Sequence, residues 1–290
     1  MHRARSGSYG TLSAVMKDNL YWFGSRGFIF TSPWVVTEST VRHAAVVLLT
    51  ASGEPVEVTA GSQLLRHDAI AVAPLTARGL RAMDVGLLSV HVFPPHPSFR
   101  AFQAIRAPGV LALERARLAE LGPMLAHAYE GGLTSREAEG LFDAIVEAVV
   151  RQLPPVPARD RRAERLHEIL RDNPACSLPQ LARKLRLSYT GTSHYFSRAV
   201  GLPFRSYRLW LKYFNAADLR FKGGSLTKIA HAAGFADSAH LSHMWQASYG
   251  LSPSYSLDRE RVRTFLPGSV NPVSAASGAA GRERHAGGAA

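Results

Sequence analysis

The chain has one cysteine, Cys176, and no apolar run near the roughly 20 residues that a membrane-spanning helix needs. A single cysteine excludes an internal disulfide and a cysteine-rich zinc site, which suits a reducing compartment. The first ten residues, MHRARSGSYG, lack the apolar core of a secretory signal. We therefore expect a cytoplasmic protein with no membrane contact.

Acidic residues are scarce in the second half of the chain. The formal net charge is +12, and residues 158–290 hold 20 Lys and Arg against 9 Asp and Glu, whereas residues 1–157 hold 14 against 13. A basic surface could serve solubility alone. An excess confined to one half favours a polyanionic partner, nucleic acid ahead of a membrane surface.

The region 28–93 has the pattern of β-strands. Its apolar runs are short, rich in Val, Ile and Leu, and separated by Gly, Pro or Asp. Four or more such strands predict a small antiparallel barrel or sandwich, which a cluster of prolines at 94–97 ends. The predicted strands are 44–50, 55–61, 64–75 and 84–93.

Helical spacing replaces the strand pattern over residues 109–152. Leucines from Leu113 to Leu125 mark one segment, and Thr134 with Glu137 forms a capping box before a second. These helices could serve the core alone or also offer a face to a second subunit. Because proline locks φ and lacks an amide proton, LPPVP predicts a linker at 153–159 after a first domain of residues 1–152.

Two stretches of the second half resemble each other, SHYFSRAVG at 193–201 and SHMWQASYG at 242–250. Around the second copy, Ser225 can cap a helix that Gly234 ends, and Asp237 can cap another helix that runs to Gly250. A short helix, a tight turn and a second helix form the helix-turn-helix pattern.

The first copy has the same layout. Ser177 and Gln180 form a capping box, Arg186-Leu187 makes the turn, and Ser188 can cap a helix that ends at Gly201. At 100° per residue, each second helix has one apolar face and one small, polar, almost uncharged face, which suits a helix lying in a DNA groove. The candidate DNA-binding residues are Thr190, Ser193, His194, Ser197 and Arg198 on the first copy, and Ser238, Ala239, Ser242, His243 and Gln246 on the second.

A proline-free segment, 204–224, joins the copies and predicts a single helix of about 18 residues, about 27 Å long. Two recognition helices on such a spacer can reach successive major-groove faces, about 34 Å apart. This spacing explains why one chain carries two similar motifs.

Residues 160–257 resemble the DNA-binding domain of the AraC/XylS family of bacterial transcription regulators. The most specific stretch is IAHAAGFADSAHLSHMWQASYGLSP at 229–253, in which Leu241 and Trp245 stand at the two places where the family has Phe. The first motif is recognisable in LARKLRLS at 181–188, Phe196 and Gly201.

The resemblance implies a sequence-specific transcription regulator, and an activator because the family commonly activates. It also implies binding to double-stranded DNA in the nucleoid as a homodimer. It implies an α+β chain: a cupin-like N-terminal barrel that senses a small molecule, followed by an all-α DNA-binding domain over 160–266. RNA polymerase is a further candidate partner. The tail, 267–290, has few large apolar residues and is expected to be disordered.

Some residues depart from the family pattern. Gly191 and Thr192 stand where long or apolar side chains are frequent, and His194 and His243 stand where Arg is frequent. We therefore expect unequal base recognition, with the second motif setting most of the sequence preference. Ser256-Leu257 replaces a frequent Tyr-Arg, which leaves a phosphate contact there in doubt.

Two other functions compete with regulation. A cupin-type metal enzyme needs clustered histidines and a carboxylate, whereas His43, His67, His91 and His96 are scattered along the sequence. A DNA-associated protein without a regulatory role, such as a methyl-accepting repair protein, would need reactive and zinc-binding cysteines. We expect no enzymatic activity, cofactor or metal, and name His43 as a candidate effector-binding residue beside its structural alternative.

Overall fold

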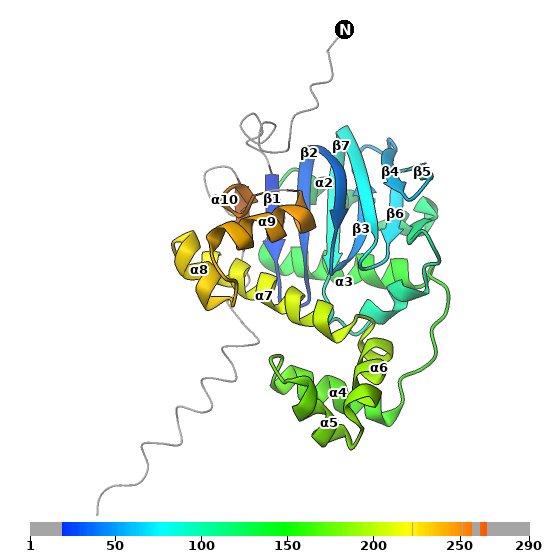
Figure 1. Cartoon of the computed structure of the whole chain (residues 1–290). Helices are drawn as coiled ribbons and strands as arrows, with labels where there is room; N and C mark the ends of the chain where they lie inside the picture. The colour runs from blue at the N-terminus through cyan, green and yellow to red at the C-terminus, as the bar shows by residue number, and fades with distance from the viewer. Residues whose placement is uncertain (1–18, 222, 251, 257–261, 266–290) are drawn as a thin grey trace, which may run out of the picture.

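The computed structural model describes residues 19–221, 223–250, 252–256 and 262–265. A β-sheet with short helices forms the first half, and helices form the second (Figure 1). This is the two-domain α+β architecture that the sequence predicts. The tail from residue 267, for which we expect disorder, lies outside the described residues. Among the described residues, no helix combines the length and apolar composition needed to cross a membrane.

The four predicted strands of the first half are present with changed bounds, and the strands Asn19–Phe23 and Gly27–Val41 precede them without having been named in the prediction. The predicted strand at 64–75 is two strands, because the chain bends at Asp68, and the predicted strand at 84–93 is the last part of a longer one. The strands are β1 (Asn19–Phe23), β2 (Gly27–Val41), β3 (Ala45–Thr50), β4 (Val56–Ala60), β5 (Gln63–His67), β6 (Ala69–Val72), β7 (Ala77–Val92) and β8 (Val110–Ala112).

The sheet is antiparallel over these strands, in the order β8-β6-β3-β7-β2-β1, with β4 paired to β5 and β7. Every residue of β3 is buried, so this strand is covered on both faces. The described pairings do not close the sheet into the predicted barrel, since β8 ends the order on one side and a ninth strand ends it on the other.

That ninth strand, β9 (Val262–Phe265), pairs in parallel with β1. The prediction of an all-α second domain over 160–266 is therefore wrong in its last part. Four residues carry too little pattern to predict a strand, and their partner lies more than 200 residues earlier in the chain. The end of the helical second half thus returns to the N-terminal sheet.

The prediction of a helix from residue 109 is also wrong in its first part. Residues 110–112 form the edge strand β8, and the amide of Leu113 donates to the carbonyl oxygen of Ala69 at 2.9 Å. Pairing with β6 satisfies backbone groups that would otherwise be buried unpaired, and so overrides helical spacing. The helical elements around it are η1 (Phe99–Ala104), η2 (Arg115–Leu121), α2 (Gly122–Tyr129) and α3 (Ser135–Val150).

The helix α3 begins at the predicted capping box. The amide of Glu137 donates to the Thr134 hydroxyl at 3.3 Å, and the Thr134 amide donates to the Glu137 carboxylate at 2.8 Å. Its apolar side packs on the sheet, where the rings of Phe142 and Trp22 lie 5.6 Å apart. The outward side of α3 is polar, with Arg136, Glu139 and Glu147 exposed.

The second half contains seven helices among the described residues. The predicted linker has no regular structure up to Asp160, whose carboxylate caps the first helix. The helices are α4 (Arg161–Asp172), α5 (Leu178–Leu185), α6 (Tyr189–Val200), α7 (Phe204–Phe221), α8 (Leu226–Ala232), α9 (Ser238–Tyr249) and α10 (Pro253–Ser256).

The apolar core has two parts. The larger runs from the N-terminal sheet into α4, α5 and α6 and includes Phe196 and Trp210. The smaller belongs to the end of α7 with α8 and α9 and is built around Tyr213 and Trp245. The first helical pair therefore shares its core with the sheet, whereas the second has a core of its own.

Candidate nucleic-acid interface

The first helical pair, α5 and α6, forms a helix-turn-helix with the predicted caps. The amide of Ser177 donates to the Gln180 side chain at 2.8 Å, which completes the capping box. Arg186, in the turn, has a φ of 53°, and the amide of Gly191 donates to the hydroxyl of Ser188 at 3.1 Å. These local bonds fix where α6 begins.

The second pair, α8 and α9, repeats this arrangement. The hydroxyl of Ser225 accepts from the amide of Lys228 at 3.4 Å, and the carboxylate of Asp237 accepts from the amide of His240 at 2.7 Å. Gly234 makes the turn with a φ of 82°. Both motifs end at a glycine with positive φ, Gly201 after α6 and Gly250 after α9.

The inward faces of α6 and α9 are those predicted from the helical wheel. Thr192, Phe196 and Ala199 are buried on α6, and Leu241, Trp245 and Ser248 are buried on α9. The buried hydroxyls have partners: Thr192 donates to the carbonyl oxygen of Ser188 at 2.7 Å, and Ser248 donates to the Tyr213 hydroxyl at 3.1 Å.

The predicted DNA-binding residues all lie away from these buried faces. On α6, Thr190, His194 and Arg198 are exposed, and on α9, Ala239, His243 and Gln246 are exposed. The four serines of the set are half-buried: Ser193, Ser197, Ser238 and Ser242. The structure therefore gathers the set onto one surface of each helix.

The hydroxyls of two of these serines are already used within their helices. Ser197 donates to the carbonyl oxygen of Ser193 at 3.0 Å, and Ser242 donates to that of Ser238 at 2.8 Å. In this state they offer a ligand only acceptor capacity. The donors best placed on α9 are therefore His243 and Gln246, and those on α6 are Thr190, His194 and Arg198.

Arg198 takes part in a contact that the sequence does not reveal. Its guanidinium lies over the Tyr195 ring, 5.4 Å from the centroid, and the Tyr195 hydroxyl donates to the Asp160 carboxylate. This hydrogen bond is the main cause that holds the pKa of Asp160 below its usual value. This hydrogen bond connects the middle of α6 to the N-cap of α4.

The helix α7 is the predicted spacer, and it binds a loop of each motif. Arg208 donates to the carbonyl oxygen of Ala175, just before α5, at 2.8 Å. One turn further along, Lys212 donates to the carbonyl oxygen of Gly234, in the turn of the second motif, at 2.5 Å. The two motifs are thereby held on one 18-residue helix.

Comparison with known proteins agrees with this geometry. Residues 181–259 match a family model described as a helix-turn-helix domain. The match lies within the second half of the chain and runs from within α5 to beyond α9, so it spans both helical pairs. No curated protein sequence gives a significant match.

Three solved structures illustrate what the whole chain is similar to in fold. ToxT from Vibrio cholerae O395 bound to (E)-4-(8-methylnaphthalen-1-yl)but-3-enoic acid is 12% identical over 80% of this chain and 97% of that one, with a TM-score of 0.50. Another ToxT structure from the same strain is 14% identical over 79% and 95%, with a TM-score of 0.49. The AraC-like transcriptional activator CuxR is 14% identical over 79% and 80%, with a TM-score of 0.34.

The two domains share an aromatic interface. Phe23, from β1, stacks on Phe214 of α7 with ring centroids 5.6 Å apart. Phe93, just after β7, lies 5.6 Å from the Trp210 ring of the same helix. The spacer helix α7 is therefore also the surface on which the N-terminal sheet rests (Figure 1).

His43, the candidate effector-binding residue, lies at this interface. It follows β2, and its ring is 5.6 Å from that of Tyr213 on α7. Burial lowers its pKa to about 4, so the imidazole is neutral near pH 7. The Tyr213 hydroxyl donates to the carbonyl oxygen of Met244 at 2.9 Å, which connects His43 to α9 through one side chain.

The end of α9 also touches the sheet. Arg42 donates to the carbonyl oxygen of Tyr249 at 3.3 Å, and a methyl group on Gly250 would lie 2.7 Å from Cγ2 of Thr37 on β2. The end of α6 is held differently, since the Gln103 side chain donates to the carbonyl oxygen of Gly201. Each motif thus has its own link to the N-terminal domain.

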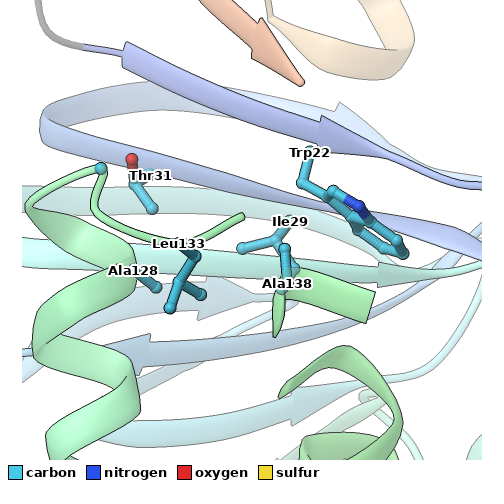
Figure 2. A pocket seen from close by; sticks show the side chains of 7 residues that line it. Trp22, Ile29, Thr31, Ala128, Leu133 and Ala138 are labelled. Atoms are coloured by element: carbon cyan, nitrogen blue, oxygen red, sulfur yellow. The ribbon is translucent and has the colours of Figure 1, made fainter. Parts of the chain in front are cut away.

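A small pocket lies between the sheet and the helices α2 and α3, as Figure 2 shows. Trp22, Ile29 and Thr31 line it from the sheet, and Ala128, Leu133 and Ala138 line it from the helical side. Its cavity volume of ≈ 30 Å³ gives room for about one or two waters. In this conformation it is too small for an organic effector.

The histidines weighed for a metal enzyme are not brought together. His91 stacks on Phe28 with ring centroids 3.9 Å apart, whereas His96 packs against Phe142 at 5.7 Å. No group of three or more His, Cys, Asp or Glu side chains placed to hold a metal occurs in the described part of the chain.

Proposed function

We propose that the chain reads DNA with the outward faces of α6 and α9. The observation that carries this proposal is the repeated design: two helices with matching caps, matching closing glycines and small polar outward faces, both attached to α7. The donors His243 and Gln246 make base contacts on α9, with Gln246 suited to pair with adenine. Thr190, His194 and Arg198 make the contacts of α6, mainly to phosphates.

The N-terminal domain, in this proposal, senses a small molecule and passes the signal to the motifs. The likeness to ToxT bound to a butenoic acid derivative supports the fold that such a sensor needs. His43 then acts as a coupling residue beside the sensing site, because its ring lies 5.6 Å from the Tyr213 ring of α7. The sheet forms the cupin-like part of this sensor, over residues 1–152.

The chain acts by binding and not by catalysis, as regulators of this type do in general. Its place of action is the cytoplasm, with double-stranded DNA and RNA polymerase as partners. Self-association through residues 109–152 remains part of the proposal. The outward side of α3 is charged, so the contact would be polar, and the mass of the full chain at micromolar concentration, with and without DNA, tests it.

The test of DNA binding is selection of duplex DNA from a random pool by the full chain. We expect one enriched site whose affinity falls at least about 100-fold between 50 and 200 mM salt, because each neutralised phosphate releases condensed counterions. A His243→Ala, Gln246→Ala double variant should lose the enrichment. Arg81→Ala, at an exposed position of β7 outside both motifs and outside residues 109–152, is the control that should keep it. A pool that stays random with the wild-type chain would remove the proposal.

A further inference from the structure

Arg78 is a buried cation without a partner in the described part of the chain. It lies on β7 with only 2% of its surface exposed, and neither Nη1 nor Nη2 has a hydrogen-bond acceptor. The ion pairs of the described residues involve other arginines. Burial, and then the charge of Arg42, lower its pKa well below the usual value.

Among the described residues, the charge that acts on Arg78 is the positive charge of Arg42, and no carboxylate contributes to its pKa shift. The charges of Arg42 and Arg78 both lower the pKa of buried His91, after burial itself, so the three side chains form one basic cluster. The Nε2 atom of His91 is hydrogen-bonded to the Ser89 hydroxyl at 2.9 Å, and its Nδ1 atom has no partner. The neutral imidazole therefore still has a nitrogen available to a ligand.

A buried guanidinium requires a compensating negative charge nearby. Arginine does not lose its proton in proteins, so Arg78 stays charged despite its burial. An isolated buried ion is heavily penalised unless an opposite charge and hydrogen bonds compensate. The cluster of Arg42, Arg78 and His91 is therefore suited to bind an anion from outside the chain, which would neutralise its charge.

The cluster lies next to β2, the strand that the end of α9 contacts. Thr40 of β2 is the cross-strand partner of Arg78, and its hydroxyl donates to the Arg78 carbonyl oxygen at 3.4 Å. The same hydroxyl accepts from Arg42 at 3.4 Å, and a methyl group on Gly250 would lie 3.3 Å from Thr40 Cγ2. Arg42 thus connects this strand to the Tyr249 carbonyl oxygen at the end of α9.

We propose that Arg78 is the charge-recognising residue of an effector site, where it pairs with the carboxylate of a small amphipathic organic acid and Arg42 provides the second cationic contact. This inference deepens the proposed function and rests on the N-terminal domain being a sensor. The planar guanidinium fork matches a carboxylate with two parallel hydrogen bonds. Leu80 and Ala82, which are buried and share the Arg78 face of β7, suit an apolar body better than a second charge.

The position of the site also explains how a bound ligand could change the DNA-binding surface. If Arg42 turns toward a bound carboxylate, it gives up its hydrogen bond to the Tyr249 carbonyl oxygen. The end of α9 then loses its hydrogen bond to Arg42, while the link of α6 through Gln103 is untouched. Effector binding would therefore change the second motif and leave the first in place.

The test compares octanoate with octan-1-ol and with inorganic phosphate, using the melting temperature of the full chain. The variant is Arg78→Met, and the control is Arg81→Met, an exposed arginine on the same strand. Octanoate at a hundredfold excess over its Kd should raise the melting temperature of wild type and of Arg81→Met by about 5 °C. Octan-1-ol and phosphate should give less than half of that rise, and Arg78→Met should give none.

Without ligand, Arg78→Met should melt no lower than wild type, because it removes an uncompensated buried charge. A lower melting temperature would mean that Arg78 has an internal counter-ion and would overturn the proposal. Equal stabilisation by octanoate and octan-1-ol, stabilisation by phosphate alone, or octanoate stabilisation that survives in Arg78→Met would each overturn it too, as would no response to any probe. DNA binding, measured in parallel, separates these outcomes from failure of the proposed function.

Discussion

The two helix-turn-helix motifs are alike in sequence and different in their surroundings. Both use a hydroxyl or carboxylate cap, a tight turn and a closing glycine. The first motif shares its core with the N-terminal sheet, whereas the second packs in a separate cluster on the end of α7. Similar local patterns therefore give motifs that differ in how they are stabilised.

The difference extends to the links with the N-terminal domain. The first motif is linked by Gln103, from η1, at the end of α6. The second is linked by Arg42 and by the contact of His43 with Tyr213, both next to the buried basic cluster. We infer that the first motif is the fixed part of the DNA-binding half and the second is the part that can respond.

The largest expected effect comes from removing the central aromatic residue of each motif. Phe196→Ala and Trp245→Ala should each lower the free energy of unfolding of the affected part by about 3–5 kcal/mol. Because the cores are separate, Trp245→Ala should melt α8 and α9 before the rest, whereas Phe196→Ala should lower the main transition. Calorimetry with hydrogen exchange measures both. A single transition in Trp245→Ala would show that the second motif is not an independent unit.

The closing glycines give the next effect. Left-handed backbone disfavours any side chain by about 1–2 kcal/mol, so Gly201→Ala and Gly250→Ala should both destabilise. Gly250→Ala should cost more, because the new methyl would lie 2.7 Å from Thr37 Cγ2, whereas the nearest atom at Gly201 is Cα of Arg100 at 3.2 Å. Adding Thr37→Ser, which removes that methyl group, should partly restore the melting temperature of Gly250→Ala and not that of Gly201→Ala.

The exposed histidines test base recognition in the two motifs. His243→Ala should weaken preference at one base pair by about 1 kcal/mol or more, and His194→Ala should cost less. Titrations of both variants against single-base changes of the selected site measure the difference. Greater damage from His194→Ala, or an equal loss on every sequence, would contradict the unequal roles.

Acidification should weaken the link to the second motif. His43 has a folded-state pKa of about 4, below the unfolded value near 6.5. Unfolded chains therefore bind the proton more readily, so the stabilisation is complete above pH 6.5 and falls as the pH drops toward 4, by about 2 kcal/mol at pH 5. His43→Phe keeps a ring opposite Tyr213 and should reduce the slope. The rest of the pH dependence should remain in this variant, because burial also lowers the pKa values of His96 and His167 to about 4. An unchanged slope would exclude His43 as a source.

Much of the DNA-binding half could be predicted because its signals are local. A cap such as Ser188 or Asp237 acts on an amide three residues away, and a closing glycine acts on its own backbone. The buried and exposed faces of α6 and α9 follow from one helical period. The strand β9 and the start of the segment at 110–112 could not be predicted, because both depend on pairing with distant strands.

The sequence by itself determined two helix-turn-helix motifs, the length of the spacer between them and the side chains on their outward faces. Only the tertiary structure decided that His43 faces Tyr213, that Tyr195 binds Asp160, and that Arg78 is enclosed without a described counter-ion. The physical reason is range. Capping and helical periodicity depend on residues within about four positions, whereas burial and charge pairing depend on which distant elements the sheet and α7 bring together.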